Sequence, residues 1–257
     1  MTKSETRVNS RDFGLALIAF LVALALWQMP GLSFLTYPLR LFVTMIHELG
    51  HGLAALATGG EFLSFHVMAD GAGLAYTRGG WRFLVIQGGY LGTALFGAGL
   101  LWLTYRTAYP ERVAIGLGVA LIVGSSFYSR IGAGNLGTPE GQRLFFATAG
   151  NFLTLTVGVL SGTALISLGR RGNRELVRVT LTFLAFITGL QAITDSWTVF
   201  KIVLLPHATT PLNDASTMAN EYGGPATFWA LVWIAADVAI FGAAVYHVLL
   251  RDRLRRG

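Results

Sequence analysis

The sequence predicts an all-α polytopic membrane protein with about six to seven transmembrane helices and one short β-hairpin. Its mean hydropathy is +0.58, 53% of its 257 residues are hydrophobic and 12% are charged, whereas soluble domains carry about 25% charged residues. Seven apolar segments follow one another, and most are long enough to cross about 30 Å of hydrocarbon as helices. We therefore expect one integral membrane domain over residues 1–257.

Short polar or glycine-rich stretches separate the apolar segments. In chain order the segments are Phe13–Phe34, Pro38–Thr58, Phe83–Tyr105, Val113–Tyr128, Leu144–Leu168, Leu176–Leu205 and Ala226–Leu250. Pro30 interrupts the first segment and Val113–Tyr128 is short, so six or eight crossings are also possible. The first segment lacks the small-residue cleavage site of a signal peptide, and we expect it to be a retained anchor.

Charge is sparse and lies at the ends of the predicted helices. The net charge of +6 comes from 19 Lys and Arg residues, many of them in the tails 1–12 and 251–257 and in the loop around 170–178. Such short, separated clusters are typical of topology signals and lipid-headgroup contacts, and they disfavour a nucleic-acid surface. The chain has no cysteine, which excludes disulfides, iron–sulfur clusters and thiolate zinc sites.

A metal-binding pattern lies inside the second apolar segment, at His47, Glu48 and His51. On a helix the two histidines share one face and can hold one Zn²⁺, while the glutamate can accept a proton from water. The pattern arises by chance in roughly one of several hundred chains of this composition. The alternative is two histidines packed structurally, but burying them with a carboxylate in a membrane is costly.

The stretch Gly59–Gly80 after the motif is polar and partly alternating around Asp70 and Gly71. This pattern favours a β-hairpin, with a plain turn between two helices as the alternative. An extended strand edge beside such a metal site could pair with an unwound peptide backbone.

The next apolar segment is rich in small residues between Gln87 and Gly99. Small residues allow close helix contacts in membranes. We expect this segment to pack on the motif helix, against the small residues Gly50, Gly52, Ala54 and Ala55.

A catalytic zinc has three protein ligands and one open position, so a third ligand is needed. The remaining acidic and histidine candidates are His66, Asp70, Asp195, His207, Asp214, Glu221, Asp237 and His247. Asp195 lies within an apolar segment, where a carboxylate needs a partner. Asp214 precedes a short run typical of a helix and is expected to be its N-cap, with the carboxylate presented at the helix start. The residues alone leave Asp195 and Asp214 open.

These residues resemble the site-2 protease family of intramembrane zinc metalloproteases, in its compact branch without extra soluble domains. The resemblance rests on the run from His47 to Gly60, on Gly89–Gly92, and on Asn213, Asp214 and Ala215 followed by Met218 and Ala219. In that branch the late motif has serine and leucine where this chain has Asn213 and Met218. The resemblance favours Asp214 over Asp195 as the third ligand.

The resemblance implies a zinc-dependent endopeptidase that cuts peptide bonds in or near transmembrane segments of other proteins. Zn²⁺ would be held by His47, His51 and Asp214, with Glu48 as the catalytic base. The expected partners are a transmembrane protein substrate and the lipid bilayer, and the expected location is a bacterial cytoplasmic membrane as a multi-pass protein. The alternative is a non-proteolytic metal-binding regulator or transporter-like protein, for which Asp195, Asp237 and His247 could mark an ion path.

Overall fold

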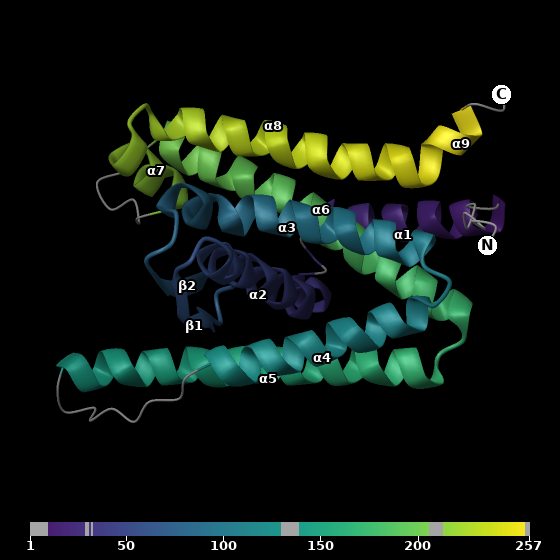
Figure 1. Cartoon of the computed structure of the whole chain (residues 1–257), viewed down its shortest axis with the longest axis horizontal. Coiled ribbons are helices and arrows are strands. Elements are labelled where there is room, and N and C mark those ends of the chain that lie inside the picture. The colour runs from purple at the N-terminus through teal and green to yellow at the C-terminus, as the bar shows by residue number, and fades with distance from the viewer. Residues whose placement is uncertain (1–9, 29–30, 32, 130–138, 206–212, 255–257) are drawn as a thin grey trace. The chain divides into compact units, whose positions relative to one another are not determined.

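A computed structural model describes residues 10–28, 31, 33–129, 139–205 and 213–254, and these residues are mostly helical (Figure 1). The helices are α1 (Ser10–Gln28), α2 (Ser33–Ala57), α3 (Arg82–Arg106), α4 (Pro110–Tyr128), α5 (Pro139–Arg171), α6 (Arg174–Leu204), α7 (Asp214–Tyr222), α8 (Ala226–Val245) and α9 (Arg251–Leu254), with a π-helical turn (Tyr246–Leu250) between the last two. One antiparallel hairpin joins β1 (Glu61–Val67) to β2 (Gly73–Arg78). The predicted all-α fold with a hairpin after the motif helix is confirmed.

Five helices in the described ranges are long and apolar enough to cross a membrane. They span Arg82–Arg106, Pro110–Tyr128, Asn151–Arg171, Arg174–Leu204 and Ala226–Leu250. The motif helix α2 is not among these five, and it carries Arg40, His47, Glu48 and His51 among its apolar residues. α2 thus carries ionisable side chains within an apolar helix, as expected for a segment that does not face lipid on all sides.

The break between the first two helices differs from the break between the first two apolar segments. The first predicted segment ran to Phe34, but α1 ends at Gln28 and α2 already begins at Ser33. Pro38, predicted to open the second segment, lies inside α2. An interior proline removes one backbone donor and disfavours a helix, yet α2 is continuous through Pro38, so the segment break lies before Ser33.

The chain forms two compact units. The first unit comprises residues 1–29, 90–110 and 173–257, with α6 packed against both α1 and α8. Phe186 of α6 makes edge-to-face contacts with Phe20 of α1 and Phe241 of α8. The bare Cα of Gly189 faces the ring of Phe241. A contact between two aromatic rings therefore sets the spacing of α1 and α6. Between α6 and α8, the absence of a side chain at Gly189 makes room for the ring of Phe241.

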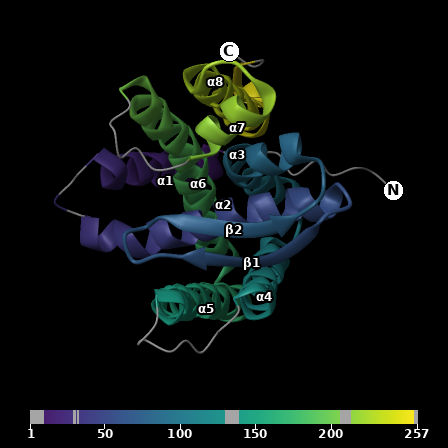
Figure 2. The same ribbon diagram turned by 90° about the vertical axis from the view of Figure 1, so that its left-hand side faces the viewer.

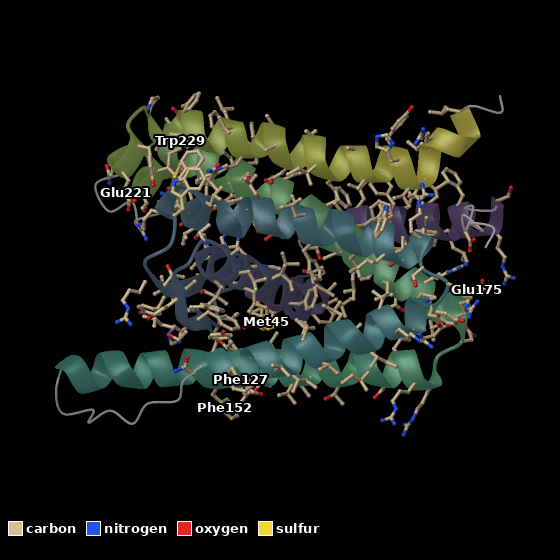
Figure 3. The ribbon with its side chains drawn as sticks, in the orientation of Figure 1. Met45, Phe127, Phe152, Glu175, Glu221 and Trp229 are labelled. Atoms are coloured by element: carbon tan, nitrogen blue, oxygen red, sulfur yellow. The ribbon has the colours of Figure 1, made fainter. Side chains whose placement is uncertain are left out.

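The second unit comprises residues 30–89 and 111–172. It contains α2, the hairpin, α4, α5 and the first turns of α3. α4 and α5 lie side by side (Figure 1), and the backbones approach closely where Gly118 meets Gly162. Met45 of α2 is fully buried, whereas Phe127 and Phe152 are 74% and 66% exposed on α4 and α5 (Figure 3). Large exposed aromatic side chains on a long apolar helix are suited to contact with lipid.

The hairpin is anchored on both sides within this second unit, and Figure 2 shows it lying along α2. Phe62 of β1 covers the bare Cα of Gly52 in α2 and stacks on Tyr128 of α4 with ring centroids 4.1 Å apart. The amide of Val67 donates to the hydroxyl of Thr154 in α5 at 2.7 Å. α5 therefore covers the outer edge of β1. The sheet has two strands, so its other edge is that of β2.

Candidate metal centre

The motif residues lie on one face of α2, as their spacing predicts. The Nε2 atoms of His47 and His51 are 3.1 Å apart, and the two rings meet edge to face. Successive turns of a helix place residues i and i+4 one above the other, and here both rings turn the same nitrogen toward a common point. The two predicted histidine ligands are therefore brought together.

The orientation of His51 is fixed from outside α2. Its Nδ1 lies 2.8 Å from the backbone carbonyl of Val85, in the first turn of α3, and His51 is buried. A carbonyl can only accept, so Nδ1 donates to it, and in the neutral ring Nε2 of His51 then presents its lone pair. This is the support that metal-binding histidines commonly receive. Sequence reasoning missed Val85, because a backbone carbonyl leaves no signature in the sequence.

Two glycines of α3 allow α2 to approach this closely. Gly88 meets Gly50 backbone to backbone, and a Cβ on Gly88 would also meet Ala54. The predicted packing through small residues is thus confirmed for Gly50 and Ala54, whereas Gly52 faces Phe62 of the hairpin instead. A Cβ on Gly89 would press on Nε2 of both motif histidines. A side chain larger than hydrogen would fill the space toward which the two nitrogens point.

Glu48, the predicted base, is only 5% exposed. The start of β2 lies directly over it, because a Cβ on Gly73 would overlap the carboxyl group of Glu48. The hairpin and the carboxylate are thus in direct contact. Gly73 was not singled out in the sequence, since its position over Glu48 depends on the register of a strand and a helix distant in the chain.

The residues of α2 and α3 fit a zinc ion by their chemistry and spacing. Two ligands of a tetrahedral zinc, with bonds of about 2.0–2.1 Å, stand about 3.3 Å apart, close to the 3.1 Å between the two Nε2 atoms. A hydrogen bond between two neutral imidazoles would suit this distance too. The bare Cα of Gly89 beside both nitrogens adds the space that a bound ion requires.

Asp214 lies in the first unit, so its predicted role as third ligand to the histidines of the second unit stays a prediction. The expectation that Asp214 is an N-cap is wrong. Asn213 is the N-cap of α7, has extended backbone angles, and accepts from the amide of Ser216 through its side chain at 3.0 Å. Asp214 is the first residue of the helix and half-buried. Asn caps helices as well as Asp, so the cap does not require the Asp214 carboxylate.

Two further carboxylates of the first unit, those of Asp195 and Asp237, accept hydrogen bonds inside the protein. Oδ1 of Asp195 accepts from Gln191 one turn earlier at 2.7 Å, and Oδ2 of the fully buried Asp237 accepts from the hydroxyl of Ser196 at 2.6 Å. These hydrogen bonds give Asp195 and Asp237 a structural explanation within α6 and α8.

The remaining candidates lie in varied surroundings. His66 is buried in β1 against the ring of Tyr76, and Asp70 accepts from the amide of Ala72 in the hairpin turn. Glu221 is exposed near the end of α7, and the ring of His247 contacts that of Tyr246. His207 lies outside the described residues. Asp70 is used to shape the turn, as Asp commonly is.

The chain matches the model of one protein family, described as peptidase M50B-like, over residues 16–136 and 144–244. The matched ranges contain the motif on α2, the hairpin, and Asp214. No curated protein and no solved structure matches the chain. The match covers most of the sequence, and the chain therefore belongs to the peptidase M50B-like family, a family of membrane metallopeptidases.

Proposed function

We propose that this protein is a zinc-dependent intramembrane endopeptidase of the site-2 protease type. The observation that carries the proposal is the pair of histidine Nε2 atoms 3.1 Å apart, with Glu48 buried on the same helix. Their helix belongs to a chain whose described residues include five helices long and apolar enough to span a membrane. Family membership supports peptidase chemistry, and the histidine geometry supports zinc as the metal.

His47, His51 and Asp214 would hold the ion. Bound zinc supplies a Lewis acid, which makes water more acidic and a peptide carbonyl more electrophilic. The assignment of Asp214 is supported by the resemblance of Asn213, Asp214 and Ala215 to the late motif of the family. It is also supported by the capping of α7 through Asn213 and by the hydrogen bond that engages Asp195 with Gln191.

Glu48 would act as the general base and then as the general acid. Its carboxylate accepts a proton from the attacking water, and it returns that proton to the leaving amine. Burial under Gly73 keeps bulk water away from the carboxylate. His51 is held by Val85, so its ring keeps one tautomer throughout.

The substrate would be a transmembrane segment of another protein, bound along the outer edge of β2. The amide of Val67 points to Thr154 and away from β2, so its cross-strand partner Gly73 also directs its backbone groups outward. Two residues on, Ala75 repeats this orientation. An unwound substrate backbone paired there would lie beside Glu48, and main-chain pairing requires no particular sequence.

The substitution Glu48→Gln tests this function. Glutamine fills the same volume but cannot take the proton, so the variant should keep its zinc and lose cleavage of a single-span transmembrane reporter in detergent micelles. Elemental analysis gives zinc per chain, and gel analysis gives the cleaved fraction. Cleavage by Glu48→Gln at the wild-type rate would rule out the proposed mechanism, and loss of zinc would place Glu48 among the ligands instead.

A further inference from the structure

A row of three side chains on α2 holds the hairpin turn in place. Tyr37 donates to the carbonyl of Ala69 at 2.7 Å, Arg40 to that of Asp70 at 3.0 Å, and Thr44 to that of Gly71 at 2.8 Å. The three donors differ in chemistry but meet three consecutive carbonyls. We call Tyr37, Arg40 and Thr44 the turn clamp.

The clamp continues the face of α2 that carries the site. The spacings 37, 40, 44 and 48 follow the three- and four-residue periods of one helix face. The backbone of the hairpin runs along that face, with Ala69, Asp70 and Gly71 at the clamp and Gly73 at Glu48. Only Ala72 lies between Gly71, the last clamped residue, and Gly73, which covers the Glu48 carboxylate.

The turn itself is shaped to accept the clamp. Gly71 has φ of 89°, in the left-handed region that favours glycine, and a Cβ there would run into the guanidinium of Arg40. Within the turn, the amide of Gly71 donates to Met68, and the amide of Ala72 donates to Asp70 Oδ1. Because the carbonyls of 69, 70 and 71 accept from α2, the turn is tied to the helix at three successive residues.

We propose that Tyr37, Arg40 and Thr44 are positioning residues that set the register of the hairpin along α2, and so determine which substrate bond reaches Glu48. This proposal rests on the proposed function. A substrate strand paired with β2 is held in a fixed register with β2. A displacement of the hairpin along α2 would therefore displace the substrate relative to Glu48. Orientation errors near 1 Å can cost about 100-fold in rate, so a loosened clamp should be visible in both turnover and cleavage position.

The test compares variants that remove the donor groups of the clamp. Thr44→Val and Tyr37→Phe each remove a hydroxyl at nearly constant volume, and a triple variant adds Arg40→Met, which replaces the guanidinium by an apolar group of similar length. Thr44→Ser keeps the hydroxyl and should restore wild-type behaviour. Thr156→Val is the matched control, because the Thr156 hydroxyl is exposed on α5 and bonds to its own helix at Phe152.

Two readouts are measured on the full-length protein in micelles. Hydrogen exchange over residues 68–75 should be at least tenfold faster in the triple variant, with zinc content unchanged. Mass spectrometry of the products from a single-span transmembrane reporter should show a tenfold or greater fall in turnover per zinc, and cuts at bonds next to the wild-type one. General destabilisation would reduce the yield of product but would not move the cut.

Either of two results would overturn the proposal. Unchanged exchange over 68–75 would mean that the clamp does not hold the turn. Faster exchange with the same turnover and the same cut bond would mean that the held turn does not position the substrate. A failure of the proposed function would look different, because Glu48→Gln would then cleave like wild type, while the exchange measurement would still decide whether the clamp fixes the turn.

Discussion

One prediction concerns Gly89 of α3, where an added Cβ would meet the Nε2 atoms of both motif histidines. An ideal Cβ on Gly89 would lie 2.5 Å from Nε2 of His51, and real Cβ atoms essentially never come closer than 3.0 Å. In Gly89→Ala the ring of His51 must therefore withdraw by about 0.5 Å, whereas metal–ligand distances tolerate about 0.2 Å. His47 is pressed by the same methyl group, so both ligands are disturbed together.

We expect Gly89→Ala to lower zinc affinity at least 100-fold, which is about 2.8 kcal/mol. The assay is competition with a zinc chelator of known affinity, followed by elemental analysis of detergent-purified protein. Gly99→Ala is the control, because it makes the same change in the same helix and a Cβ there meets nothing within 4 Å. If Gly89→Ala bound zinc as tightly as Gly99→Ala, the two nitrogens would not be pointing at a metal site.

Three further predictions follow from the structure. Gly73→Ala places a Cβ on the Glu48 carboxylate, so turnover per zinc should fall at least tenfold while zinc is retained; undiminished turnover would show that β2 does not constrain the base. Ser196→Ala removes the donor to the buried Asp237 and should destabilise the protein by about 0.6–1.7 kcal/mol in mixed-micelle unfolding, with an effect near zero arguing against a structural role for that pair. A chelator should stop cleavage of the reporter and added zinc should restore it, whereas cleavage that persists after the metal has been removed would exclude a metalloprotease.

The sequence predicts the large features because they depend on neighbouring residues. The spacing of His47 and His51 brings two nitrogens together on any regular helix, and they do converge. The polar, alternating stretch after the motif does form the hairpin. The small residues at 50 and 54 do meet Gly88 of α3. Periodicity and residue size are local properties, so a single sequence reveals them.

The features that the sequence did not reveal are of two kinds: a choice between two neighbouring residues that are equally able to cap a helix, and contacts between distant segments. Asn213 and Asp214 are both good capping residues, and the choice of Asn213 follows from its extended backbone and its bond to Ser216. Val85 supports His51 through a backbone carbonyl that every residue possesses. The contact of Gly73 with Glu48 follows from the position of the hairpin on α2. Such contacts follow from tertiary packing, which no local pattern encodes.

The central claim is that one zinc ion is held by His47, His51 and Asp214. Elemental analysis of freshly purified wild type, Asp214→Asn and Asp195→Asn tests it most directly, because asparagine keeps the shape of aspartate and removes its charge. We predict about one zinc per chain in wild type and Asp195→Asn, and little in Asp214→Asn. Loss of zinc in Asp195→Asn with retention in Asp214→Asn would move the third ligand to α6, and wild type without zinc would contradict the account as a whole.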